Sequence, residues 1–139
     1  MLDLTNDRHA HRDRRLRSEQ IIWLGSTRPD GRPHTVPVWF DWDGRTMMIF
    51  SQPGNQKVKN LRHDPRVTLH LEATPDGSDI VILEGTAELL SEPAAEVVST
   101  AYLEKYATGI PNIGHTPESM IATYSQAIRV IPTRIIGWD

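Results

Sequence analysis

Short apolar runs recur along this chain, and turn signals separate most of them. The β-branched run at residues 21–27 predicts a buried strand, and "HTVPVWFDW", residues 34–42, predicts a second strand. Between them, "RPDGRP" is typical of a turn, because proline presets one turn dihedral and glycine accepts a positive one. Pro37 lies inside the second run and has no N–H for a ladder hydrogen bond, so we expect it at a sheet edge or a bulge.

The middle of the chain continues this pattern with a hairpin, a helix and two further strands. Asp43-Gly44 is a strong hairpin signal that joins the second run to "RTMMIFS". The segment "QKVKNLRHD" predicts a short helix that ends before Pro65, because a residue that precedes proline avoids the helical region. "RVTLHLEA" alternates apolar and polar residues, and "IVILEGTAELL" follows a turn, so we expect both to be strands.

Helices are expected at the start of the chain and in its last third. The charged start has Asn6 or Asp7 as a possible helix cap. The segment "SEPAAEVVSTAYLEKYATG" has apolar residues at a helical period, with Ser91 as a candidate cap. Thr116 and Pro117 suit the cap and first position of a second short helix. Between the two helices, residues 109–119 are expected to form a loop.

The last apolar run, "AIRVIPTRIIGW", predicts a sixth strand that Pro132 interrupts. Strands joined mostly by hairpins, with helices between them and at one end, are typical of an antiparallel β-barrel with peripheral helices. We therefore predict a mainly β protein, a six-stranded antiparallel barrel, in one domain over residues 1–139.

Composition and charge exclude several classes of function. The chain has 139 residues and a net charge of −3 with both signs interspersed, which argues against a nucleic-acid-binding surface. It has no cysteine, so thiolate chemistry is excluded, and its six histidines lack ligand spacing, so we assign no metal. No apolar run reaches membrane length and the start lacks a secretory signal, so we expect a cytoplasmic protein with no membrane partner. No sequence signature of acyl transfer or of a P-loop is present.

The segment "SQPGNQKVKNLRHDPRV" combines several groups that bind anions. If residues 56–63 are helical, Lys57 and Asn60 share one face near the helix N-terminus, where free N–H groups favour a phosphate. Ser51 can add a hydroxyl on the same side, whereas Lys59 is expected to point into solvent. The alternative is a solvated turn followed by a helix with surface charge.

The tryptophans of "PVWFDW" lie beside the strand proline. Trp39 either covers a planar ligand or fills a subunit interface, and the case for Trp42 as a ligand contact is weaker.

Three segments in a fixed order carry a resemblance to a known family: "GSTRPDGRPHTVPVWFDWDG", "SQPGNQKVKNLRHDPRVTLHLE" and "EGTAEL". The chain resembles the split β-barrel flavin and deazaflavin oxidoreductases, the superfamily of pyridoxamine 5′-phosphate oxidase. PVWF followed by S…K..NL..DPRV is similar to the branch that binds the deazaflavin F420. The flavin-binding branch tends to have an arginine in the second strand, where this chain has "HTVPVWF", and this departure weighs against FMN without excluding it.

The resemblance implies a homodimer with the cofactor in a groove at the subunit interface. The second strand would lie along the planar ring system, and the helix region would hold the phosphate and its linker. The cofactor-binding residues that the resemblance implies are Thr35, Pro37, Val38, Trp39, Ser51, Lys57 and Asn60. Reduced F420 would then pass hydride to a conjugated, electron-poor small molecule.

Some alternatives remain open in the sequence. No catalytic acid or base is assigned, although His34 and Tyr124 are candidates for proton delivery. The same fold also serves FMN-dependent oxidases or reductases, or a non-catalytic protein that binds a flavin, a deazaflavin or a tetrapyrrole.

Overall fold

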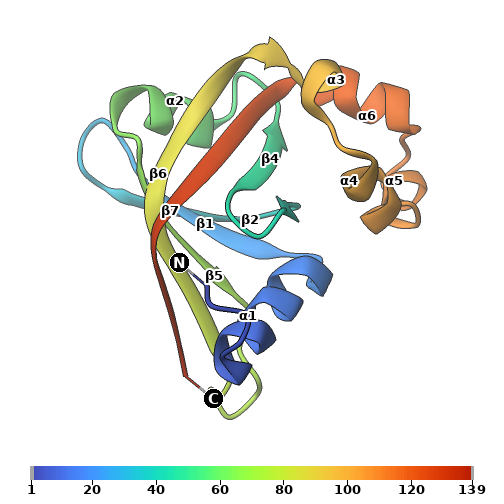
Figure 1. Ribbon diagram of the computed structural model, residues 1–139. Coiled ribbons are helices and arrows are strands. Elements are labelled where there is room, and N and C mark those ends of the chain that lie inside the picture. Colours follow the sequence, from blue (N-terminus) through green and yellow to red (C-terminus); the bar gives the residue numbers. More distant parts are fainter. Residues whose placement is uncertain (1, 139) are drawn as a thin grey trace.

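One strongly curled antiparallel sheet dominates the structure, a computed structural model that describes residues 2–138 apart from the side chain of Trp138 (Figure 1). Its seven strands run in the order β2-β1-β5-β6-β7-β4-β3, and the sheet does not close on itself within the described residues. The bounds are β1 (Ile22–Thr27), β2 (Pro33–Val38), β3 (Asp41–Trp42), β4 (Met47–Ser51), β5 (Arg66–Leu71), β6 (Ile80–Pro93) and β7 (Gln126–Trp138). The predicted class, a mainly β split barrel with peripheral helices, is confirmed.

The number of strands differs from the sequence prediction, with seven in place of six. The run predicted as one strand divides at residues 39–40, so that β2 pairs with β1 and β3 pairs with β4 at the other edge of the sheet. The backbone of Phe40 makes this division possible, because its N–H and C=O bond to the side chains of Tyr106 and Lys105 instead of to a neighbouring strand. The predicted hairpin at Asp43-Gly44 is confirmed, with Gly44 at a positive φ of 99°.

The two prolines predicted to interrupt strands occupy positions that tolerate them. Pro37 is in β2, an edge strand. On the free side of such a strand, the N–H that proline lacks would have had no ladder partner. Pro132 lies opposite Gly85, next to a register shift that leaves Thr133 as an extra residue in β7. A side chain at Gly85 would collide with the backbone of Ile131, so the strands approach closely there.

The helices lie around the sheet. They are α1 (Asp7–Ser18), α2 (Gln56–His63), α3 (Ala94–Val97), α4 (Thr100–Lys105), α5 (Gly109–Asn112) and α6 (Pro117–Thr123). Asn6 caps α1 and Thr116 caps α6, as predicted. In Figure 1, α3 to α6 form a group at one end of the sheet, and α1 lies apart from α3 and α6.

Two predicted segments in this region differ from the structure. No helix begins at Ser91, because β6 continues to Pro93. The helix expected after it is divided, and the Ser99 side chain accepts a hydrogen bond from the N–H of Tyr102 to cap α4. The segment 109–119, expected as a loop, contains α5 and the start of α6.

Two clusters of buried side chains form the core. The larger lies inside the curled sheet and takes Leu16 from α1 and Val58 and Leu61 from α2. The smaller joins α3 to α6 to the sheet, and consists of Phe50, Ala94, Tyr102, Tyr106, Ile110, Met120 and Ala127. The second cluster fixes the helices beside β4, and a cleft lies at this junction. None of the helices in the described residues has the length and apolar character that crossing a membrane requires.

Candidate functional site

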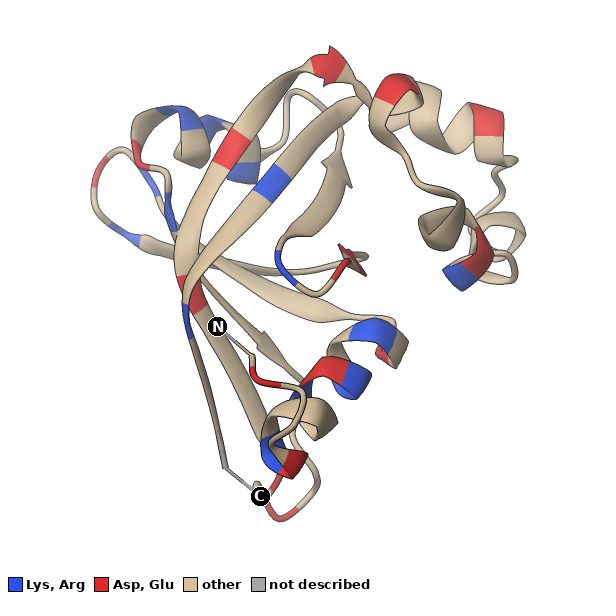
Figure 2. Cartoon of the chain, in the orientation of Figure 1, with Lys and Arg blue, Asp and Glu red and all other residues tan. Residues whose placement is uncertain are grey.

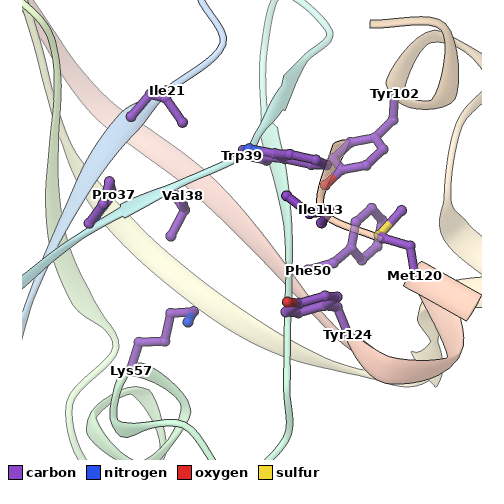
Figure 3. Close-up of a pocket in the computed structure, with 10 residues that line it drawn as sticks. All are labelled: Ile21, Pro37, Val38, Trp39, Phe50, Lys57, Tyr102, Ile113, Met120 and Tyr124. Carbon is purple, nitrogen blue, oxygen red and sulfur yellow. The ribbon is translucent and has the colours of Figure 1, made fainter. Parts of the chain in front are cut away.

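A cleft of about 290 Å³ lies between β2, β4, α2 and the α4 to α6 helices (Figure 3). The residues that line it are Ile21, Pro37, Val38, Trp39, Phe50, Lys57, Tyr102, Ile113, Met120 and Tyr124. Most of these side chains are apolar or aromatic. Its polar groups are the Lys57 amine, two tyrosine hydroxyls and one indole N–H, and this mixture is typical of sites for small organic ligands.

The free edge of β2 forms one wall of the cleft. Among the described strands, β2 pairs with β1 alone, so its other side carries backbone groups without a ladder partner there. Pro37 and Val38 lie where this edge meets the cleft. Unpaired strand groups next to an apolar wall suit a flat heterocycle that carries its own carbonyl and N–H groups.

Lys57 brings a positive charge to the opposite side of the cleft. It lies in the first turn of α2, and Figure 3 shows its amine directed into the cleft. Burial lowers the pKa of this half-buried amine, and the described residues offer it no hydrogen bond or ion pair. The α2 N-terminus also has no side-chain cap and no acidic residue in its first turn. This end of the cleft is therefore suited to an anionic group.

Four of the residues predicted to bind the cofactor line the cleft together: Pro37, Val38, Trp39 and Lys57. Thr35 is not among the cleft residues. It is exposed and borders a neighbouring hollow of about 470 Å³ on β1, β2 and β5. Lys59 is exposed, as predicted.

The other two predicted residues are buried beside the cleft. The Asn60 side chain is 0% exposed, its Nδ2 donates to Ser26 Oγ at 3.0 Å, and its Oδ1 accepts from Gln56 Nε2 at 2.8 Å. Ser51 is also buried, and its hydroxyl donates to the carbonyl of Gln52. The structure gives Asn60 and Ser51 partners within the protein, and their role toward a phosphate stays a prediction.

The two candidates for proton delivery lie in different places. Tyr124 lines the cleft, and His115 contacts its ring edge-on at a centroid distance of 5.9 Å. His34 borders the neighbouring hollow, with a buried Nδ1 that has no partner in the described part of the chain. Burial, with Arg28 and Lys57 adding to it, lowers the pKa of His34.

Sequence reasoning missed the wall that the helices contribute. Tyr102 and Met120 line the cleft from segments that were predicted only as helices, and Ile113 lines it from the segment 109–119. Burial raises the pKa of Tyr102, so its hydroxyl stays protonated. The helical spacing of Tyr102 and Tyr106 was visible in the sequence, but it does not indicate which cavity the face meets.

Charge is distributed unevenly around the cleft. Figure 2 shows basic residues along α2, whereas α3 to α6 carry Glu96, Glu104 and Glu118 with Lys105 as their basic residue. An anionic tail that leaves the cleft would therefore be favoured over α2. Within residues 2–138, no group of His, Asp and Glu side chains converges to hold a metal ion.

Comparisons with known proteins agree on one family. A family model described as pyridoxamine 5′-phosphate oxidase matches residues 8–139. The conserved hypothetical protein Rv2991 from Mycobacterium tuberculosis has a similar structure, with 30% identity, a TM-score of 0.73, and coverage of 94% of this chain and 83% of that one. No curated protein matches the sequence significantly.

Two other solved structures have the same fold at lower identity. One, an F420 reductase, is 23% identical with a TM-score of 0.69, over 89% of this chain and 94% of its own. The other, the haem storage protein HutZ from Vibrio cholerae, is 13% identical with a TM-score of 0.61, over 90% of this chain and 91% of its own. Similarity at these levels establishes the fold, and the choice of cofactor has to be argued from the cleft.

Proposed function

Since this chain belongs to the pyridoxamine 5′-phosphate oxidase family, we propose that it is an oxidoreductase that uses the deazaflavin F420. Its reaction would be the transfer of a hydride from reduced F420 to a conjugated, electron-poor small molecule. The observation that carries this proposal is the Lys57 amine, half-buried in an apolar cleft and without an anionic partner among the described residues.

The residues of the cleft fit such a cofactor. A volume of about 290 Å³ is at the low end for a ligand site, so it suits a ring system better than a whole cofactor. The phosphate-bearing tail would leave the ring past Lys57 and the uncapped N-terminus of α2, where charge favours it. When bound, the reduced deazaflavin supplies the hydride, and the protein supplies binding, orientation and the exclusion of water.

Each wall of the cleft has a separate task in this proposal. The free edge of β2 orients the heterocycle through backbone groups, and Lys57 neutralises the phosphate. Phe50, Tyr102 and Met120 exclude water from the opposite side. The Tyr124 hydroxyl lies in the cleft and is the group we propose for donating a proton to the reduced product.

The choice of F420 over FMN rests on the second strand. The flavin-binding branch of the family tends to place an arginine in this strand, whereas here the residues that face the cleft are Pro37, Val38 and Trp39. Among the described residues that line the cleft, Lys57 is then the cationic side chain, which suits a single phosphodiester. The F420 reductase that shares this fold supports the proposal as an analogy.

A titration with three ligands tests the proposal. Purified protein is titrated with F420, FMN and hemin while intrinsic tryptophan fluorescence is monitored, because Trp39 lines the cleft. We expect saturable quenching with F420 at a lower concentration than with FMN or hemin. Oxidation of reduced F420 is then followed by absorbance with quinones and unsaturated lactones as acceptors. Tighter binding of FMN or hemin would refute the choice of cofactor, and F420 binding without turnover would indicate a carrier.

A further inference from the structure

The backbone of Phe40, where the chain passes from β2 to β3, is held by two side chains of the α4 region. Its N–H donates to Tyr106 Oη at 2.8 Å, and its C=O accepts from Lys105 Nζ at 2.8 Å. Tyr106 Oη donates in turn to the carbonyl of Gln20 at 2.7 Å. The Tyr106 hydroxyl thus links Phe40, where the predicted strand divides, to Gln20, which precedes β1.

The ring of the same tyrosine supports Trp39. The two rings are stacked with centroids 4.3 Å apart and an interplanar angle of 4°. Gly109 packs closely against the same indole, because a Cβ at that position would lie 3.2 Å from the Trp39 ring. Trp39 is nevertheless half-exposed and lines the cleft, so part of its indole remains accessible to a ligand.

Lys105 contacts both Phe40 and Tyr106. Its Nζ lies 3.7 Å from the centroid of the Phe40 ring and 5.5 Å from that of Tyr106, in addition to its bond to the Phe40 carbonyl. Phe40 itself is fully buried. The backbone that follows Trp39 is therefore held at both the N–H and the C=O of Phe40.

We propose that Tyr106 and Lys105 are positioning residues that hold the Trp39 indole as a preformed stacking wall for a planar, conjugated ligand. Tyr106 acts twice, through its hydroxyl on the Phe40 N–H and through its ring on the indole. Lys105 acts through the Phe40 carbonyl. The statement about the ligand rests on the proposed function, whereas the positioning of Trp39 is a property of the protein alone.

The variant Tyr106→Phe tests the hydroxyl because it keeps the stacking ring. It leaves the Phe40 N–H without its acceptor, so we expect hydrogen exchange at this amide to quicken about tenfold or more relative to the buried amide of Ile128. Protein labelled with 5-fluorotryptophan gives a second readout. The Trp39 resonance, assigned with Trp39→Phe, is expected to shift or broaden while the resonances of the other three tryptophans stay in place.

Two further variants make the test decisive. Tyr102→Phe is the matched control for these two readouts, because Tyr102 is a buried tyrosine of α4 whose hydroxyl makes no hydrogen bond within the described residues. It is expected to leave the Phe40 exchange rate and the Trp39 resonance unchanged. Lys105→Met keeps the side-chain length but removes the donor, and is expected to give a smaller change in both, so the proposal stays testable if Tyr106→Phe does not fold.

Ligand binding completes the test. For Tyr106→Phe we expect the Kd of F420 or the KM of the acceptor to rise roughly two- to tenfold. The value of kcat is expected to be retained. Unchanged Phe40 exchange and an unchanged Trp39 resonance in both Tyr106→Phe and Lys105→Met would overturn the positioning role. If the wild-type protein binds no F420, the proposed function fails, but both readouts on the free protein still decide the positioning role.

Discussion

Lys57 and Lys59 belong to the same turn of α2 but meet different surroundings. Lys57 is half-buried in the cleft and Lys59 is exposed. On a helix the two side chains point roughly 200° apart, which places one toward the cleft and the other into solvent. Variants of these two lysines therefore distinguish a specific contact with an anionic ligand from a general attraction between the ligand and a basic surface.

We expect Lys57→Ala to weaken F420 binding by roughly ten- to over a hundredfold, because a charge-assisted hydrogen bond to phosphate contributes about 1.5–3 kcal/mol. Lys59→Ala is the matched control and should change the affinity little. Fluorescence titration at fixed ionic strength measures both. Equal losses in the two variants would contradict a specific role for Lys57.

Lys105 gives a prediction about pH. Burial lowers the pKa of its amine to about 8, whereas an unfolded lysine keeps a pKa near its ordinary value of 10.5. Between these values the unfolded state binds more protons than the folded state, so the contribution of this group to stability rises as the pH rises from about 8 to 10.

We therefore expect the stability of the wild type, measured relative to Lys105→Met, to increase over this pH range. Urea denaturation at a series of pH values measures the difference, and the variant corrects for all other titrating groups. A difference that is independent of pH, or that falls as the pH rises, would contradict the prediction.

At the scale of elements, α2 is held to β1 by a buried polar contact as well as by its apolar face. Val58 and Leu61 join the core, and the fully buried Asn60 bonds to Ser26 of β1. Asn60, which the family resemblance assigns to the phosphate, thus also connects α2 to β1 by a hydrogen bond.

Asn60→Ala should lower the free energy of unfolding by about 1–3 kcal/mol, because it leaves the buried Ser26 hydroxyl without its partner. Gln56→Ala, which removes the more exposed partner of the same amide, should cost less. Denaturant unfolding measures both. An unchanged stability for Asn60→Ala, together with weaker F420 binding, would assign Asn60 to the ligand and not to the fold.

The long β6–β7 ladder depends on close approach at Gly85. A Cβ there would meet the carbonyl oxygen of Ile131 and the backbone of Pro132, next to the extra residue of the bulge. Backbone has little freedom to move aside in a central pair of strands.

We expect Gly85→Ala to destabilise the protein by about 3 kcal/mol or more, the upper end of the range for overpacking. Gly54→Ala is the matched control, since nothing lies within 4 Å of the Cβ it would add. That variant should be neutral or stabilise by about 0.4–1 kcal/mol through the unfolded state. Thermal unfolding of both variants measures this, and equal melting temperatures would contradict it.

At the scale of the whole molecule, the cleft exists because the two ends of one sheet approach each other. β2 is the strand at one edge, and β4 lies next to β3, the short strand at the other edge. The helices α4 to α6 complete the cleft without closing it, and Ile113 at the cleft is 49% exposed. An open site with an exposed apolar residue is suited to completion by a second subunit.

We propose that the protein is a homodimer in which the second subunit completes the cleft. An obligate interface buries more than about 2,000 Å² in total, so we expect a stable dimer at micromolar concentration. Light scattering coupled to size-exclusion chromatography measures the mass. A monomer at micromolar concentration would refute the proposal.

Local patterns in the sequence determined most of the elements, because turns, caps and short strands depend on neighbouring residues. Asp43-Gly44 marked a hairpin, Thr116-Pro117 marked a helix start, and Pro37 indicated an edge strand. The helical phase of "QKVKNLRHD" also separated Lys57 from Lys59 correctly. These features need no information from distant parts of the chain.

The tertiary structure decided what depends on contacts between distant residues. The second strand divides at Phe40 because Tyr106 and Lys105, more than sixty residues later, bind its backbone. The same contact brings Trp39 against Tyr106, and no local pattern predicts that stack. Asn60 shares a helix with Lys57, yet it is buried against Ser26, because the sheet beneath the helix decides which side chains reach the cleft.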